Sequence, residues 1–238
     1  KSGTMRRFLQ SLQDTYRRLG AVNWSWLIVH RLLGRLTGGW ARVHRYYLVV
    51  QPVRVRREQG MRAVPGSTVS QIDRDDPIVA EFPRPAEVIA NRFDQGSLCY
   101  VAQVKGRFAG YLWLSFGGYE EDEVRCRFEF DEPAISAWDF DVYVAPDFRL
   151  GRTFTRLWDA ANRELASRGI KWTYSRIDAF NARSIGAHRR MGMEPLNAAT
   201  FVCLGALQIA FLGAAPYFHI SARDRYRPFL KLQVPGGV

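Results

Sequence analysis

The stretch Val144-Ala145-Pro146-Asp147-Phe148-Arg149-Leu150-Gly151-Arg152 joins an expected strand to an expected helix and decides the fold. We expect the strand over 138–144, with Pro146 and a basic turn after it. We expect the helix over 153–167, because apolar residues recur there at helical spacing and Gly169 follows as a stop signal. Free backbone N–H groups and the helix dipole favour an anion at such a helix N-terminus. The sequence therefore predicts a site for a phosphate-like anion at this turn.

A second strand and helix follow. The strand is expected over 172–178 and the helix over 184–191, within the motif Asn181-Ala182-Arg183-Ser184-Ile185-Gly186-Ala187-His188-Arg189-Arg190-Met191-Gly192. Asn181 stands between the two elements, where its side chain can cap the helix.

Further elements flank this core. Alternating apolar residues predict strands at 68–72, 98–104, 108–116 and 124–130, with a two-residue turn at Lys105-Gly106. Helices are expected near 73–77 and 85–93, and the last strands at 199–204 and 217–221. This order predicts a mixed sheet with helices on both of its faces.

The order of elements resembles that of the GNAT superfamily of acyl-CoA N-acyltransferases. So do the motifs V-x-P-x-[aromatic]-R before the main helix and N-x-x-S-I…G-M after the next strand. The resemblance covers about residues 67–222. It implies an α/β (α+β) fold with a mixed, mostly antiparallel central sheet. It divides the chain into a basic helical N-terminal extension with a strand, at 5–66, and an acyltransferase domain at 67–238.

The resemblance also implies a donor site. In the family, the strand before the main helix separates from its neighbour, and the gap receives the pantetheine arm of acyl-coenzyme A. Val142, Tyr143 and Val144 would line this arm, and Asn181 would bond a pantetheine amide as well as, or instead of, capping its helix. The pyrophosphate would lie on a loop formed by Arg149, Leu150, Gly151, Arg152, Thr153 and Phe154.

Three positions depart from the family pattern. The family usually has glycine where this chain has Arg152 and Phe154, and glycine occurs here one position early, as Gly151. The two side chains would either crowd a phosphate or supply ligands to it. His188 stands where the family usually has a tyrosine that protonates the leaving thiolate. A histidine can donate a proton near neutral pH, so His188 is the first candidate acid. The alternative is a partly buried packing residue.

A general base is needed because an attacking ammonium must first lose a proton. Asp139, Asp141 and Tyr143 alternate along the expected strand, so we expect them on one face. Carboxylates on a central strand are costly unless they are paired or used. Asp139 or Asp141 is therefore the candidate base or amine anchor, and the alternative is a buried network with Arg176 of the next strand.

The run Tyr119-Glu120-Glu121-Asp122-Glu123 is a third acidic feature. It is interpreted either as a solvated loop or as a surface that attracts a cationic amine to the acceptor side of the sheet. The extra strand expected at 124–130 would wall the acceptor pocket.

The net charge of +11 lies entirely in residues 1–66, which contain 13 basic and two acidic side chains. Two amphipathic helices are expected there, at 5–20 and 23–37, then a strand at 45–53 and a polar connection at 54–66. Residues 5–40 would bind an anionic membrane surface or acyl carrier protein, or pack on the domain or on a second copy in a homodimer. Nucleic acid is not expected, because the aromatic residues fall on the apolar stripes.

Cysteine and hydropathy patterns limit the remaining choices. Cys99, Cys126 and Cys203 are widely spaced and fit a reduced, cytoplasmic protein. The uncharged run 195–222 contains polar and glycine residues, so buried strands are expected rather than a membrane span.

The expected activity follows from the resemblance. It is transfer of an acyl group, acetyl by default, from coenzyme A to a small-molecule primary amine, without a metal. The enzyme would be cytoplasmic or peripheral to the inner face of the membrane. The alternatives are a long-chain acyltransferase that uses acyl carrier protein and a non-catalytic module that binds acyl-CoA.

Overall fold

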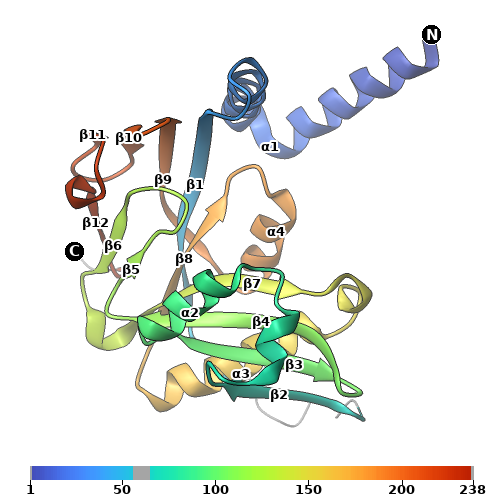
Figure 1. Cartoon of the computed structure of the whole chain (residues 1–238), viewed down its shortest axis with the longest axis vertical. Coiled ribbons are helices and arrows are strands. Elements are labelled where there is room, and N and C mark those ends of the chain that lie inside the picture. Colours follow the sequence, from blue (N-terminus) through green and yellow to red (C-terminus); the bar gives the residue numbers. More distant parts are fainter. Residues whose placement is uncertain (1, 56–64, 237–238) are drawn as a thin grey trace. The chain divides into compact units, whose positions relative to one another are not determined.

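The computed structural model describes residues 2–55 and 65–236, with side chains from residue 13 onward. The expected connection at 54–66 thus lies mostly outside the described residues. The chain forms two compact units. The first unit contains residues 1–51, 120–129 and 176–235, and the second contains 52–119, 130–175 and 236–238. Figure 1 labels the helices and strands of the chain.

The second unit contains strands in the order β8-β7-β4-β3-β2. Neighbouring strands are antiparallel except β7 and β8, which are parallel. The predicted mixed, mostly antiparallel sheet is therefore confirmed. The strands are β2 (Ser67–Ile72), β3 (Leu98–Val104), β4 (Arg107–Phe116), β7 (Ser136–Val144) and β8 (Trp172–Asp178), the last contributing its first four residues to this unit.

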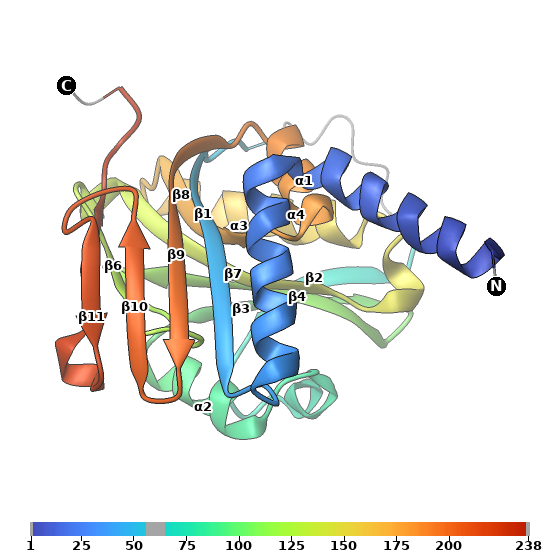
Figure 2. The same cartoon turned by 90° about the horizontal axis from the view of Figure 1, so that it is seen from above.

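Helices cover both faces of this sheet (Figures 1 and 2). The main helix α3 (Thr153–Ser167) has the predicted bounds and packs on β2, β3, β4 and β7. Its apolar stripe is buried because Leu157, Ala161 and Leu165 recur at helical spacing. On the other face lies α2 (Ala86–Asp94), whose Phe93 ring meets the Trp113 ring of β4 edge-on at 4.8 Å. Short 3-10 turns include η2 (Pro77–Glu81), η3 (Pro133–Ile135) and η4 (Pro146–Phe148).

The first unit contains four antiparallel strands in the order β11-β10-β9-β1. They are β1 (Ala41–Pro52), β9 (Glu194–Leu204), β10 (Leu207–Leu212) and β11 (Phe218–Ser221). The uncharged run 195–222 thus forms strands, as predicted. Within the described ranges, no helix is both long and apolar enough to cross a membrane.

The N-terminal helix α1 (Ser2–Leu36) consists of two segments, as the sequence predicted. They meet at Gly20, whose φ of 75° and ψ of 166° interrupt the helix. The second segment lies along β1 (Figure 2). Asn23 links this segment to β1. Its amide nitrogen donates to the Tyr47 hydroxyl at 2.6 Å, and its oxygen accepts from Arg45 Nε at 2.9 Å.

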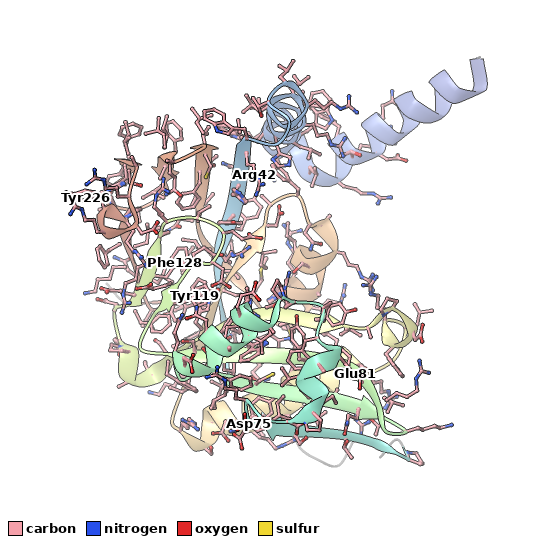
Figure 3. All side chains as sticks on the ribbon, in the orientation of Figure 1. Arg42, Asp75, Glu81, Tyr119, Phe128 and Tyr226 are labelled. Atoms are coloured by element: carbon pink, nitrogen blue, oxygen red, sulfur yellow. The ribbon has the colours of Figure 1, made fainter. Side chains whose placement is uncertain are left out.

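Two smaller features complete the first unit. Helix α4 (Ala182–Arg190) follows β8. A three-stranded sheet has the order β12-β6-β5, made of β5 (Tyr119–Glu120), β6 (Arg127–Phe130) and β12 (Phe229–Leu232). Of these three strands, only β6 was predicted, within the strand expected at 124–130. Phe128 of β6 is fully buried, whereas Tyr226 before β12 is exposed (Figure 3).

Candidate active site

Strand β7, the predicted donor-binding strand, contains a β-bulge. Tyr111 of β4 pairs with Tyr143, and Trp113 pairs with Phe140, so two residues of β7 lie opposite one residue of β4. Asp141 is one of these two, and its φ is 45°. A bulge of this kind bends the strand and redirects the side chains that follow it.

The bulge places the two candidate carboxylates differently. Asp141 accepts a hydrogen bond from the Tyr111 hydroxyl at 3.0 Å, whereas Asp139 faces the hydroxyls of Thr173 and Ser175 on β8. The expectation that Asp139 and Asp141 share one face is therefore wrong. One extra residue in a strand reverses the side to which later side chains point.

Gly110 of β4 allows the close approach of the bulged strand. A Cβ atom at this position would lie 2.3 Å from the carbonyl oxygen of Tyr143 and 3.1 Å from Val144 Cα. Both contacts involve backbone atoms, which cannot turn aside. The bulge thus requires glycine here, and sequence reasoning missed this requirement because it emerges only from strand pairing.

Asp139 is buried directly after the last residue pair that joins β7 to β8. The parallel register runs from Ser136 opposite Trp172 to Trp138 opposite Tyr174, and Asp139 is the next residue. It is 1% exposed, and its Oδ2 has no hydrogen-bond partner among the described residues.

Burial changes how Asp139 titrates. It raises the pKa of Asp139 to about 7, and the neighbouring hydroxyls of Thr173 and Ser175 oppose the rise only in part. This carboxyl can therefore take up or release a proton near neutral pH.

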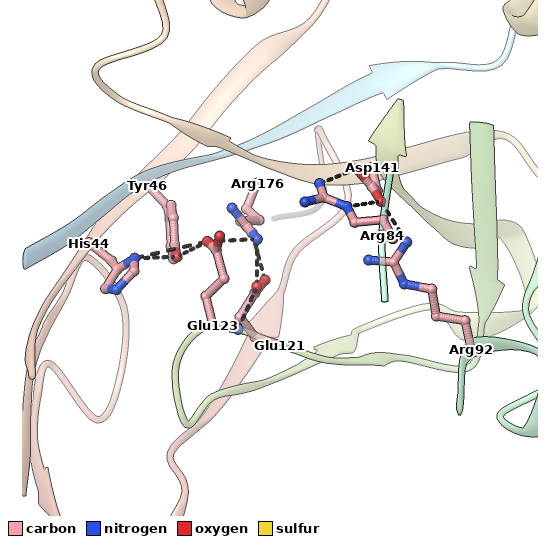
Figure 4. A network of polar contacts seen from close by, with 8 residues as sticks. All are labelled: His44, Tyr46, Arg84, Arg92, Glu121, Glu123, Asp141 and Arg176. Carbon is pink, nitrogen blue, oxygen red and sulfur yellow. Dashed lines mark hydrogen bonds and ion pairs between the residues drawn. The ribbon is translucent and has the colours of Figure 1, made fainter. Parts of the chain in front are cut away.

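Asp141 instead belongs to a cluster with Arg84, Arg92 and Tyr111, here called the Asp141 cluster. Figure 4 shows its two arginines on Asp141. Arg84 donates from Nε and Nη2 at 2.9 and 2.6 Å, and Arg92 donates from Nη1 at 2.6 Å. Burial alone raises the pKa of Asp141, but the hydrogen bonds and charges of the arginines outweigh it, so the pKa is lower than usual. Asp141 is therefore ionised and a poor base at neutral pH. Both arginines were missed, because they lie far upstream in the sequence.

The turn between β7 and α3 has the geometry of an anion site. The first helical bond of α3 joins Arg156 N to Arg152 O at 3.0 Å, and no side chain caps the helix start. The N–H groups of the first turn, Thr153 to Thr155, therefore precede the helical ladder and remain available. These donors, with the exposed Arg149 and Arg152 beside them, suit the two charges of a pyrophosphate.

The other predicted donor-site residues lie along this same segment. Val142, Tyr143 and Val144 are half-buried, and the Tyr143 ring stacks on Phe108 at 6.1 Å. Phe154 contacts Trp158 at 6.4 Å between ring centroids. The remaining loop residues Leu150 and Gly151 are exposed, and Thr153 is buried.

Asn181 and His188 belong to the first unit. Asn181 caps α4, because its Oδ1 accepts from Ser184 N at 3.0 Å, so the predicted cap is confirmed. His188 is 6% exposed, and its Nδ1 lies 3.4 Å from Gln51 Oε1. Burial lowers the pKa of His188 to about 4. The imidazole is therefore neutral at physiological pH.

The acidic run 119–123 is only partly solvated, because Asp122 and Glu123 are exposed but Glu121 is not. Glu121 is buried and receives two hydrogen bonds from Arg176, at 2.7 and 2.6 Å (Figure 4). Glu123 lies 3.0 Å from the same guanidinium and accepts from the Tyr46 hydroxyl at 2.7 Å. Glu120 pairs with arginines as well. The run is built into the first unit, and Arg176 has carboxylate partners there.

A model of the acetyltransferase (GNAT) family matches residues 67–193, which is more than half of the chain. No curated protein matches the sequence. The matched residues include β7, the turn, α3 and α4. Family membership therefore rests on the segment that contains the anion site.

Several solved structures are similar at low identity. One is an acetyltransferase assigned to the GNAT family from Novosphingobium aromaticivorans, with 17% identity and a TM-score of 0.46 over 67% of this chain and 63% of that one. A tandem GNAT protein from the clavulanic acid biosynthesis pathway has 17% identity and a TM-score of 0.47, and the match covers 77% of this chain and 58% of that one. The ribosomal-protein-S18-alanine N-acetyltransferase from Escherichia coli has 19% identity and a TM-score of 0.40, and the match covers 53% of this chain and 76% of that one. The chain thus spans less than two thirds of the first two.

Proposed function

Because the chain belongs to the acetyltransferase (GNAT) family, we propose that it is an acyl-CoA-dependent N-acyltransferase. It moves an acyl group, acetyl by default, from coenzyme A to a small-molecule primary amine by direct attack. The new N–C bond forms as the C–S bond breaks, the ammonium proton goes to a base, and the thiolate takes up a proton. The observation that supports this most is the uncapped N-terminus of α3, directly after the bulged strand β7.

The proposed donor-binding residues are those that the resemblance implies. The first-turn amides of α3, with Arg149, Leu150, Gly151, Arg152, Thr153 and Phe154, hold the pyrophosphate. Val142, Tyr143 and Val144 line the pantetheine arm. Bound acyl-CoA supplies the activated thioester, and the chain's part is to hold and orient it.

Asp139 is the proposed base. A pKa of about 7 suits proton removal near neutral pH, whereas Asp141 is locked in its ionised form by two arginines. His188 is a weaker candidate for the acid than the sequence suggested, because a buried neutral imidazole has little tendency to donate its proton. We therefore propose water as the source of the thiolate proton.

Calorimetry with acetyl-CoA, followed by thiol release on an amine panel, tests this function. Donor binding is expected in the micromolar to millimolar range, and thiol release is expected to require an amine. Arg152→Glu should weaken donor binding by about tenfold or more, because it places a like charge at the phosphate site. Arg74→Glu, on an exposed residue paired with Asp94, is the matched control. No binding at millimolar acetyl-CoA would reject the acetyl-CoA enzyme, and binding without transfer would favour the non-catalytic module.

The outer face of α1 favours a second role, binding of an anionic membrane surface on the cytoplasmic side. Val22, Val29, Leu32 and Leu36 are 61%, 39%, 52% and 82% exposed, and together they form an apolar stripe at helical spacing. Arg31 and Arg35 lie exposed in the same helix segment. An apolar stripe beside basic residues suits an anionic interface. A homodimer or a carrier-protein complex would use the same surface and is an alternative outcome.

A further inference from the structure

We propose that the Asp141 cluster is an acceptor subsite for an anionic group, and that the amine acceptor therefore bears a carboxylate or phosphate close to its amino group. The inference rests on the proposed acyl transfer and names the class of acceptor. Arg84 is the residue that contacts the anionic group.

Two cationic side chains of the cluster bind the same carboxylate. Arg84 and Arg92 both donate to Asp141. Tyr111 adds no charge, because burial raises the pKa of its hydroxyl well above neutral pH. The Arg84 guanidinium is cationic and partly exposed, so its solvent side suits an oxyanion rather than a purely cationic amine.

The two arginines have different surroundings. The Arg92 side chain is 8% exposed, and its guanidinium lies over the rings of Trp113 and Phe140 at 5.5 and 5.1 Å. The Arg84 side chain is 46% exposed. Arg92 thus fixes Asp141 from the interior, and Arg84 faces solvent from the other side of the same carboxylate.

Arg84 retains donors for a ligand. Asp141 uses Nε and one N–H of Nη2, which are two of the five guanidinium N–H groups, and the Tyr111 oxygen interacts with the same side chain. The paired bonds from Asp141 also hold the planar guanidinium in one orientation. A fixed guanidinium with spare donors loses little conformational entropy when it binds an oxyanion.

The cluster lies next to the proposed donor strand. Asp141 is at the bulge and directly precedes Val142, the first of the residues expected to line the pantetheine arm. If an anionic group is bound at Arg84, an amino group a few covalent bonds away from it would be held beside that strand. Amines with adjacent acidic groups, such as amino acids or phosphoryl-amines, fit this arrangement.

Matched amine pairs test the subsite by steady-state thiol release. Glycine, alanine, phenylalanine and glutamate are each compared with their α-amides, and O-phosphoethanolamine is compared with ethanolamine. We expect kcat/KM to be about tenfold or more higher for the anionic member of at least one series, and the series that shows the preference separates carboxylate from phosphate. Arg84→Gln should remove the preference by raising KM for the anionic amine alone. Arg84→Lys should restore part of it, and Arg74→Gln should leave it intact.

A binding measurement separates failure of the subsite from failure of the proposed function. Calorimetry follows N-acetylglycine and N-acetylglycinamide, and then N-acetyl-O-phosphoethanolamine and N-acetylethanolamine, with CoA present. Tighter binding of an anionic compound by the wild type, lost in Arg84→Gln, supports the subsite even without turnover. If CoA binds but the anionic and neutral compounds bind equally, the subsite is wrong and the donor site stands. If CoA itself does not bind, the proposed function fails, and the subsite fails with it.

Discussion

Asp139 and Asp141 are only two residues apart, yet their pKa values are shifted in opposite directions. Asp139 and Asp141 both lose solvent on β7, and burial alone would raise the pKa of both. Two arginines lower the pKa of Asp141. Asp139 instead faces the hydroxyls of Thr173 and Ser175, which lower its pKa less than burial raises it. The difference in partners therefore decides which carboxylate can act as a base.

Asp139→Asn tests this at the level of one residue. The folded protein keeps the Asp139 proton up to about pH 7, whereas an unfolded aspartate loses it near pH 4. This residue's contribution to stability is thus complete below about pH 4 and is lost as the pH rises through about 7. Raising the pH from 5 to 8 should therefore destabilise the wild type but not Asp139→Asn. We expect the stability of the variant relative to wild type to increase over this range by an amount on the order of a few kcal/mol.

Urea unfolding at the two pH values provides the measurement. Asp75→Asn, on an exposed side chain, is the control. If the stability difference between Asp139→Asn and wild type is the same at pH 5 and pH 8, Asp139 does not have a raised pKa. In the active enzyme, the same substitution should remove an inflection of kcat/KM near pH 7.

At the scale of elements, the bulge in β7 depends on its neighbour β4. Gly110→Ala would place a Cβ 2.3 Å from the Tyr143 carbonyl oxygen, so either the bulge or the strand pairing must shift. We expect a loss of about 2 kcal/mol or more in the free energy of unfolding, together with weaker acetyl-CoA binding. Gly34→Ala in α1 meets nothing within 4 Å and should stabilise the protein by about 0.5–1 kcal/mol. Equal stability of Gly110→Ala and wild type would show that the close approach is absent.

Helix α4 allows the two roles of Asn181 to be separated. Asn181→Ala removes the cap to Ser184 N and should cost about 1 kcal/mol of stability, whereas Asn181→Ser preserves capping. If Asn181 also contacts pantetheine through its amide nitrogen, both variants should bind acetyl-CoA less tightly. If affinity remains normal in Asn181→Ser, Asn181 acts only as a cap. Chemical denaturation and calorimetry on the same samples provide both readings.

At the scale of the whole molecule, charge is strongly segregated. Residues 1–66 hold the entire excess of +11, and the rest of the chain is neutral overall. The apolar stripe on α1 lies within this basic segment. A second copy would bring its own basic N-terminal segment, and the like charges oppose self-association through it. An anionic bilayer would be attracted by the charge and would cover the stripe.

Vesicle sedimentation tests this expectation. The protein should bind vesicles that contain phosphatidylglycerol more tightly than neutral phosphatidylcholine vesicles, and binding should weaken between about 50 and 500 mM salt because exposed charges are screened. Leu32→Ser with Leu36→Ser should reduce binding several-fold. Gln13→Ala, on an exposed residue of the first segment of α1, is the control. Equal binding to both vesicle types, or a stable dimer in solution, would contradict the membrane role.

Much of the fold could be predicted because periodicity and stop signals are local. The main helix begins and ends at the predicted Thr153 and Ser167, and β8 has its predicted bounds. The cap by Asn181 follows equally from a residue type at a strand–helix junction. The turn before α3 also lies where the sequence predicted it, because a turn and the helix after it are adjacent in the chain. Anion binding there stays a prediction.

The sequence by itself determined the family, the order of the main elements and the location of the turn before the main helix. Only the tertiary structure decided the chemistry beside that turn. It turned Asp141 away from Asp139 through a bulge, and it brought Arg84 and Arg92 to Asp141 from about 50 residues away. It also placed Glu121 against Arg176 and kept His188 neutral by burial. Strand register, burial and the partners of a charge depend on contacts between distant residues, and these contacts leave no local pattern in the sequence.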